Sequence, residues 1–138
     1  MQSDGFTELA HPADIALRVH AAGLSGLYLQ AARGLEYVLG CDTTGPLLPE
    51  SAREVIIESL DLETLMVDWL DELLYLAEQD GCCWHASDVQ VERPARLVAQ
   101  LQRFREPSRL REIKAVTYSG LHVAESAEGF EAIVVLDV

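Results

Sequence analysis

Two aspartates at opposite ends of the chain are the residues best placed to do chemistry. Asp14 opens the first predicted strand, and Asp137 closes the last one, directly before Val138 with its α-carboxylate. If these strands are antiparallel neighbours, the start of one lies beside the end of the other. Three oxygen donors would then meet and suit a hard cation such as Ca²⁺ or Mg²⁺. The other interpretation is an aspartate beside a turn and a frayed chain end.

Lys114 is the second candidate, because it is a cation within the run Ile113–Tyr118 (IKAVTY). A lysine on an edge strand discourages pairing with other chains, which is a structural explanation. The functional explanation is a lysine held near carboxylates. The pattern alone is compatible with both.

The cysteines do not predict a disulfide framework, since there are three and none is in a CxxC pair. The segment 82–85 (CCWH) could contribute to a soft-metal site. However, adjacent residues of a strand point to opposite faces, and no second Cys/His cluster supplies four ligands. We interpret these cysteines as small apolar residues that enter a strand, and we expect a reduced, cytoplasmic protein.

No catalytic signature is present: the sequence contains no GxxxxGK phosphate loop, no HExxH and no GxGxxG. The acidic group Asp68, Asp71 and Glu72 could bind cations or a basic partner. A solvated helix face explains the same group equally well. We therefore predict no catalytic residues.

The elements that position these residues follow from the hydropathy pattern. Residues at helical spacing predict amphipathic helices over 25–39, capped by Ser25, and over 62–80, capped by Asp61. Gly40 and Gly81 end them. Alternating or continuous apolar runs predict strands over 14–20, 53–60, 84–92, 95–104, 112–118, 121–124 and 129–137.

These elements predict an α+β fold: one domain over residues 1–138, with two helices packed on a mixed or mostly antiparallel sheet. The longer helix carries the clearest apolar stripe, formed by Leu62, Leu65, Met66, Trp69, Leu70, Leu73, Leu74 and Ala77. The final strand is apolar on both faces, which is typical of a covered central strand.

The charge balance excludes direct nucleic-acid binding. The 138 residues include 23 Asp and Glu but only 10 Lys and Arg, a net charge of −13. A polyanion would repel such a chain, whereas a divalent cation or a basic protein surface would suit it. Solubility alone is the simplest explanation. No apolar run approaches the roughly 18 residues of a membrane span, and we expect no signal peptide.

Four segments together resemble the archease family. They are HPADI at 11–15, DWLDELLYL at 68–76, EIKAVTY at 112–118 and VVLDV at 134–138, and their order covers essentially the whole chain. Two positions depart from the family pattern: Pro12 stands where threonine is usual, and Ser119 where histidine often follows the tyrosine.

The resemblance implies a small accessory protein, not an enzyme, that serves an RNA ligase acting on 3′-phosphate ends in tRNA splicing or RNA repair. The family is thought to promote the ligase's GTP- and Mn²⁺-dependent guanylylation and its turnover. By the same resemblance, the metal ligands are Asp14, Asp137 and Val138, and the functional lysine is Lys114. The implied metal is Ca²⁺, with Mg²⁺ or Mn²⁺ as alternatives. A stand-alone metal-dependent hydrolase and a general chaperone are the competing hypotheses.

Overall fold

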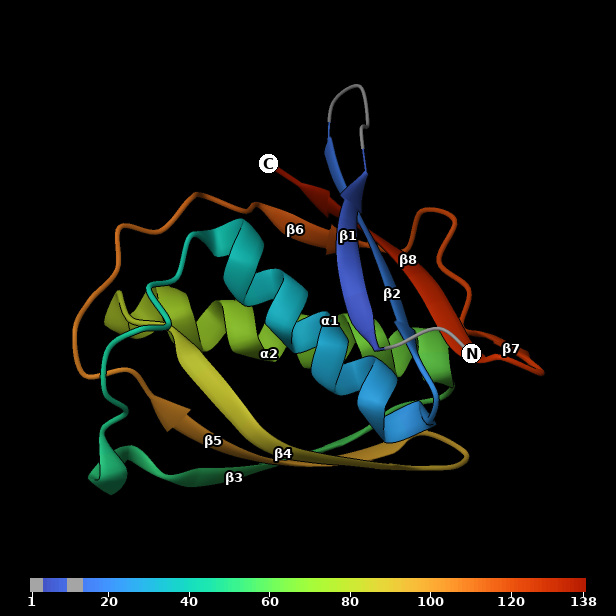
Figure 1. The fold of residues 1–138 in the computed structure, drawn as a ribbon, viewed down its shortest axis with the longest axis horizontal. Helices are drawn as coiled ribbons and strands as arrows, with labels where there is room; N and C mark the ends of the chain where they lie inside the picture. The colour runs from blue at the N-terminus through green and yellow to red at the C-terminus, as the bar shows by residue number, and fades with distance from the viewer. Residues whose placement is uncertain (1–3, 10–13) are drawn as a thin grey trace.

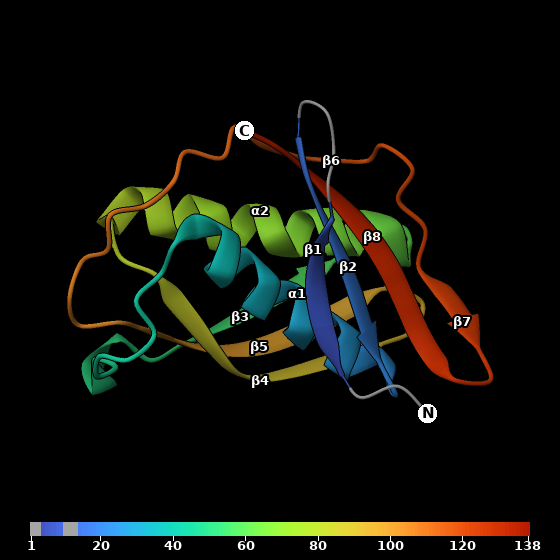
Figure 2. The same cartoon turned by 45° about the horizontal axis from the view of Figure 1, so that its top comes forward.

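The computed structural model describes residues 4–9 and 14–138, which form two helices between two sheets (Figures 1 and 2). The helices are α1 (Leu24–Leu39) and α2 (Leu62–Asp80), and a short 3-10 helix covers Pro49–Ser51. The strands are β1 (Gly5–Leu9), β2 (Asp14–Ala21), β3 (Arg53–Glu58), β4 (Trp84–Glu92), β5 (Arg96–Arg103), β6 (Ala115–Thr117), β7 (Ala124–Ser126) and β8 (Gly129–Asp137).

Both sheets are antiparallel. The larger one has the order β1-β2-β8-β6, with β7 also paired to β8, and the smaller one has the order β3-β5-β4. The predicted α+β class is confirmed. The sequence predicted one sheet, whereas the strands divide between the two sides of the helix layer. The helices therefore have apolar neighbours on two sides.

Strand β8 is central, with β2 on one side and β6 and β7 on the other. Its register with β2 pairs Ile15 with Leu136 and Leu17 with Val134, and all four side chains belong to the main core. Because side chains alternate along a strand, the residues between them lie on the outer face of the sheet, away from the helices. Strand β8 thus contributes side chains both to the core and to the outer face of the sheet.

Helix α2 has the bounds predicted from the sequence. Asp61 caps it by accepting a hydrogen bond from the Thr64 N–H at 2.7 Å, and Gly81 ends it in the left-handed conformation. Seven of the eight predicted stripe residues are buried. Val67 and Leu76, outside that stripe, are buried as well, because α2 is flanked by both sheets.

Three local predictions need correction, and one strand was missed. Gly23, not Ser25, is the N-cap of α1, and the Ser25 hydroxyl instead accepts a hydrogen bond from the Val91 N–H. The strands predicted over 112–118 and 121–124 are shorter or shifted, and both pair with β8. Strand β1 was not predicted. Residues 11–13 of the first family motif lie outside the described residues.

The two helices are joined by a buried pair of aromatic side chains. The Tyr28 hydroxyl donates to the Leu62 carbonyl at 2.6 Å, and Trp69 Nε1 donates to the Tyr28 carbonyl at 2.9 Å. Both side chains are fully buried. Burial, with Glu63 and Asp61 nearby, raises the pKa of Tyr28 well above its usual value. Each polar group of the pair is thus satisfied without water.

Replacing Tyr28 by phenylalanine should lower the free energy of unfolding by about 1–3 kcal/mol, because the Leu62 carbonyl loses its donor. The exposed Tyr75 provides the control, and Tyr75→Phe should be neutral. Since the pKa of Tyr28 is higher in the folded state, its stabilisation is complete below about pH 10 and falls at higher pH. Urea melts at pH 7 and 11 should show the gap between wild type and Tyr28→Phe shrinking.

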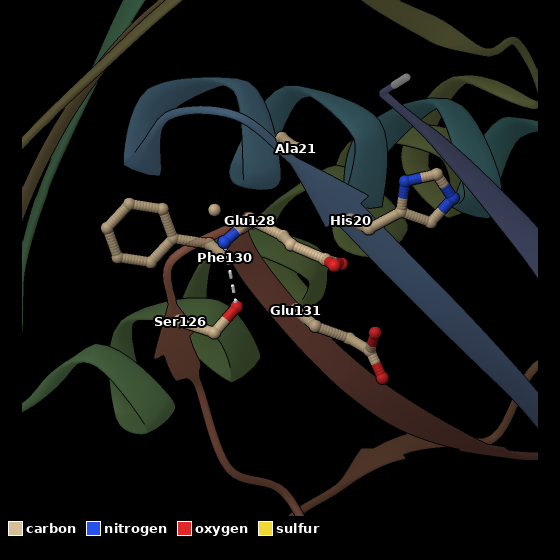
Figure 3. Close-up of a pocket in the computed structure, with 7 residues that line it drawn as sticks. His20, Ala21, Ser126, Glu128, Phe130 and Glu131 are labelled. Atoms are coloured by element: carbon tan, nitrogen blue, oxygen red, sulfur yellow. Dashed lines mark hydrogen bonds between the residues drawn. The ribbon is translucent and has the colours of Figure 1, made fainter. Parts of the chain in front are cut away.

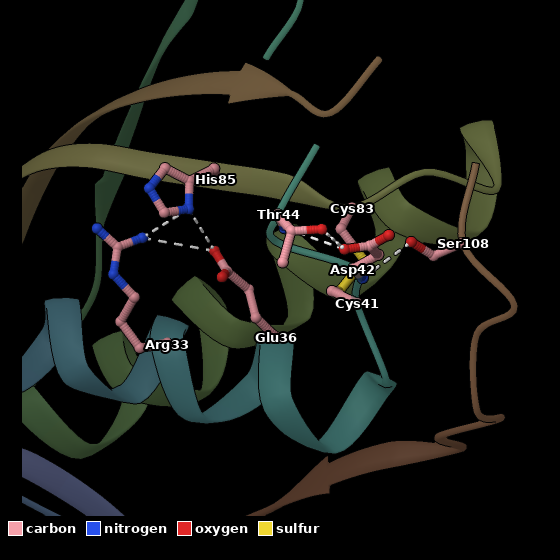
Figure 4. The surroundings of a disulfide bond; sticks show 8 residues. All are labelled: Arg33, Glu36, Cys41, Asp42, Thr44, Cys83, His85 and Ser108. Carbon is pink, nitrogen blue, oxygen red and sulfur yellow. Dashed lines mark hydrogen bonds and ion pairs between the residues drawn. A yellow bond between two sulfur atoms is a disulfide. The ribbon is translucent and has the colours of Figure 1, made fainter. Parts of the chain in front are cut away.

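A disulfide between Cys41 and Cys83 joins the C-terminal ends of the two helices (Figure 4). Cys41 follows the terminal Gly40 of α1, and Cys83 lies two residues beyond the terminal Gly81 of α2. The prediction of reduced cysteines is wrong for this pair. The two cysteines are 42 residues apart in the sequence, but their Cα atoms lie 6.0 Å apart. The sequence spacing therefore did not indicate the pairing. Cys82 is a buried free thiol, as the structural interpretation of the segment 82–85 expected.

A buried polar cluster ties α1 to β4 beside this disulfide (Figure 4). Glu36 is only 7% exposed, and its Oε1 lies 2.9 Å from His85 Nδ1 and 3.5 Å from Arg33 Nη1. His85 Nδ1 is also 2.8 Å from Arg33 Nη1. The neighbouring cation compensates the buried carboxylate, which would otherwise be costly. This cluster was not predicted from the sequence.

Opening the disulfide should destabilise the protein by about 2–4 kcal/mol, because it closes a long loop in the unfolded chain. Cys41→Ser should melt earlier than wild type without reductant and equally with excess dithiothreitol. Cys82→Ser is the matched control and should retain the response to reductant. A wild-type chain that titrates with three thiols in denaturant without reductant would contradict the pairing.

Candidate functional site

The fold brings the two predicted aspartates together. Asp14 at the start of β2 is the register partner of Asp137 at the end of β8. Directly paired residues of antiparallel strands share a face of the sheet, with Cβ atoms about 4.5–5.5 Å apart. Since Ile15 and Leu136 face the helices, both aspartates lie on the outer face. Each is only partly exposed.

Lys114 lies at the same edge of the sheet. Its backbone N–H donates to the Asp137 carbonyl at 2.7 Å, and the next residue, Ala115, is the register partner of Asp137. The Lys114 residue is exposed, and Val138 packs partly buried against the core. The same edge of the sheet therefore holds Asp14, Lys114 and Asp137, which are far apart in the sequence.

The donor chemistry at this place fits a hard cation. Within residues 4–9 and 14–138, no three His, Cys, Asp or Glu side chains are grouped as a metal site would require. Asp14 and Asp137 contribute two side-chain carboxylates at this edge, and further donors to a cation there would be main-chain oxygens and water. Ca²⁺ and Mg²⁺ accept such oxygen sets, whereas structural zinc sites use mainly nitrogen and sulfur donors.

The opposite end of the same strand pair holds a small polar pocket (Figure 3). His20 is paired with Glu131 there, and Ser126 Oγ accepts a hydrogen bond from the Glu128 N–H. The pocket volume is about 40 Å³, enough for water but not for a substrate. His20 lies six residues beyond Asp14 on one strand, about 20 Å away. The two groups are therefore separate sites.

The predicted acidic face of α2 makes contacts within the fold. Asp68 accepts a hydrogen bond from the Ser59 hydroxyl at 2.7 Å, and Asp71 is exposed. Partial burial, with Asp68 nearby, raises the pKa of Asp71. The face is thus partly engaged within the fold rather than wholly solvated.

The two departures from the family motifs have different positions. Ser119 is exposed in the turn after β6, and its N–H donates to Thr117 Oγ1 at 3.3 Å. It therefore lies on the segment that follows Lys114. Pro12 is outside the described residues.

Comparison with known proteins identifies the family. The sequence profile of the archease protein family matches residues 6–138. The chain belongs to the archease family. It is 36% identical to the protein archease of Methanosarcina acetivorans, covering 99% of this chain and 98% of that one. It is 32% identical to the protein archease of Archaeoglobus fulgidus, covering 93% and 95%.

Two solved structures share the archease fold of this chain. The solution structure of Methanobacterium thermoautotrophicum protein 1598 is similar with a TM-score of 0.77 and 23% identity, covering 97% of this chain and 99% of that one. The crystal structure of an archease, described as a possible chaperone, from Thermotoga maritima has a TM-score of 0.68 and 20% identity, with 94% of each chain covered. In the described part of the chain, neither helix is long and apolar enough to cross a membrane.

Proposed function

We propose that this archease-family chain is a metal-binding accessory protein of a GTP- and Mn²⁺-dependent RNA ligase that joins 3′-phosphate ends. It would promote guanylylation and multiple turnover of that ligase in tRNA splicing or RNA repair, in the cytoplasm. One observation supports this most directly. The register of β2 and β8 pairs Asp14 with Asp137, and the Lys114 backbone is bonded to the same residue.

The proposed ligands are Asp14, Asp137 and Val138, and the proposed cation is Ca²⁺, with Mg²⁺ or Mn²⁺ as alternatives. When bound, the cation supplies a positive charge with open, water-filled positions. The aspartates hold this charge on the outer face of the sheet. Lys114 adds a fixed cation that can pair with a phosphate or with a carboxylate of the ligase.

The acidic surface supports a protein partner rather than RNA. A ligase that handles RNA must present a basic region to its substrate, and a chain with a net charge of −13 is attracted to such a region. The same charge disfavours direct contact with RNA. We therefore assign no catalytic residue to this chain and place the chemistry in the partner.

A general chaperone would need a contiguous apolar surface. The large apolar side chains exposed in the described residues come from separate elements: Tyr37, Ile56, Leu60, Tyr75 and Tyr118. A hydrolase would need a nucleophile or general base beside the aspartates, and the sequence predicts neither.

Metal binding should stabilise the fold. At a free Ca²⁺ concentration of 100 times Kd, the free energy of unfolding should rise by about 2.7 kcal/mol. Asp14→Asn should abolish this rise, because one of the two paired carboxylates is lost. Asp71→Asn on the acidic face of α2 is the control and should respond like wild type. Denaturant melts with Ca²⁺, Mg²⁺ and Mn²⁺ provide the measurement, and an equal response in wild type and Asp14→Asn would refute the site.

Stimulation of the ligase should depend on the same residues. With GTP and Mn²⁺, the wild-type chain should speed formation of the ligase–guanylate intermediate and permit many turnovers. Asp14→Ala, Asp137→Ala and Lys114→Glu should each abolish this stimulation while still unfolding cooperatively. The surface variant Arg93→Glu should retain it.

Single- and multiple-turnover guanylylation assays separate the outcomes. Full stimulation by a folded Asp14→Ala/Lys114→Glu double variant would refute the proposed site. A ligase that does not respond to the wild-type chain would refute the proposed function itself.

A further inference from the structure

The disulfide between Cys41 and Cys83 is accessible to solvent from one side. Cys83 is only 1% exposed, whereas Cys41 is partly exposed where the chain leaves α1. Exchange with an external thiol needs access to one of the two sulfur atoms. A thiolate from solution therefore approaches the bond at Cys41, and Cys83 is the leaving group.

The chain beside each cysteine is bonded to one segment, residues 105–111, which leads from β5 towards Lys114 (Figures 1 and 4). The Ser108 N–H donates to the Gly81 carbonyl at 3.2 Å, two residues before the second cysteine. The Ser108 hydroxyl accepts a hydrogen bond from the Asp42 N–H at 3.2 Å, directly after the first cysteine. Ser108 thus bridges the two sides of the disulfide.

Packing holds this segment only weakly. Leu110 is its one side chain packed against the core, and it is partly buried. A groove of about 480 Å³ lies between the segment and the end of α2. The backbone N–H groups of Arg105 and Arg111 donate to the carbonyls of Pro46 and Leu39, both at 2.9 Å. These carbonyls flank the first cysteine in the sequence, so hydrogen bonds to the chain around the disulfide position the segment.

The helix pair has a second connection that does not involve the disulfide. Tyr28, near the start of α1, donates to the Leu62 carbonyl, and Trp69 donates to the Tyr28 carbonyl. Both aromatic side chains are fully buried. The disulfide instead follows the C-terminal ends of the helices. Breaking it therefore removes a link at one end while the core persists, which is a local change in a folded chain.

We infer that the bond between Cys41 and Cys83 is a reversible redox switch, which holds the segment 105–111 in place when oxidised and loosens it when reduced. The inference takes from the proposed function only the cytoplasmic location. Thiols are kept reduced in that compartment, and the disulfides that do form there are usually transient and either catalytic or redox-sensing. Since no catalytic residue is assigned to this chain, redox sensing is the role that remains.

Glutathione is the reductant, and its disulfide is the oxidant of the reverse reaction. A glutathione thiolate attacks the Cys41 sulfur, the S–S bond breaks, and Cys83 leaves as a thiolate that takes up a proton. A second glutathione thiolate attacks the glutathione sulfur of the mixed disulfide, and Cys41 leaves as a thiolate that takes up a proton. Two glutathione molecules are thereby oxidised to glutathione disulfide, and the two cysteines are reduced by two electrons.

The first measurement follows the bond in the folded chain. Native protein is equilibrated with millimolar glutathione and glutathione disulfide in varied ratio, and its thiols are then counted by alkylation in denaturant and mass spectrometry. We expect one thiol in excess glutathione disulfide and three in excess glutathione, with cooperative urea melting in both. The control Cys82→Ser should give none and two. A bond that glutathione breaks only after the chain is denatured would overturn the inference, since it would be a permanent crosslink.

The second measurement asks whether reduction loosens the segment. Trypsin cuts after arginine, and Arg105, Arg109 and Arg111 are all exposed. With glutathione removed under exclusion of oxygen, the initial rate of cutting at these three sites is divided by the rate at Arg96. Arg96 lies in β5, the central strand of the smaller sheet, so cutting there requires the sheet to open. The ratio therefore separates local opening of the segment from a loss of global stability.

We expect reduction to raise this ratio at least about tenfold, because opening of the segment becomes easier than opening of the sheet. Cys41→Ser should show the raised ratio in both buffers. Oxidised Tyr28→Phe, which is destabilised with its disulfide intact, should differ from wild type by less than about threefold. A ratio that reduction leaves unchanged would overturn the inference, and so would a reduced chain that no longer melts cooperatively. Neither measurement uses the ligase, so the proposed function is tested separately.

Discussion

The register between β2 and β8 is the constraint on which the candidate site depends. It buries Ile15 against Leu136 and Leu17 against Val134 on the helix-facing side. A slip of one residue would turn this apolar set to solvent and bring Asp14 into the core. The free energy that fixes the core thus also fixes the position of Asp14 beside Asp137. Packing of the core therefore holds the site in place.

Much of the fold could be predicted because its signals are local. The bounds of α2 follow from its cap residue Asp61, its terminal Gly81 and the apolar stripe between them. Helix capping and hydrophobic periodicity are both relations between residues about one helical turn apart. The failures depend on distant partners. Ser25 looks like a helix cap, but its hydroxyl bonds Val91. The strands predicted over 112–118 and 121–124 are close in the sequence, but the strands found there, β6 and β7, both pair with β8.

The candidate site was predictable only in part, for the same reason. The positions of Asp14 at the start of β2 and Asp137 at the end of β8 suggest that the two residues are close in space. They are close only if β2 and β8 are neighbouring strands, and no local sequence pattern predicts that pairing. The pairing of Cys41 with Cys83 and the burial of Glu36 beside His85 were not predictable. Both depend on how α1 packs against β4.

If Lys114 has the proposed role, screening limits its reach. Between exposed charges, attraction over more than about 8–10 Å is largely screened at physiological salt. Lys114 is exposed, and its backbone is bonded to Asp137. Its charge would therefore act on groups that already lie close to the paired aspartates.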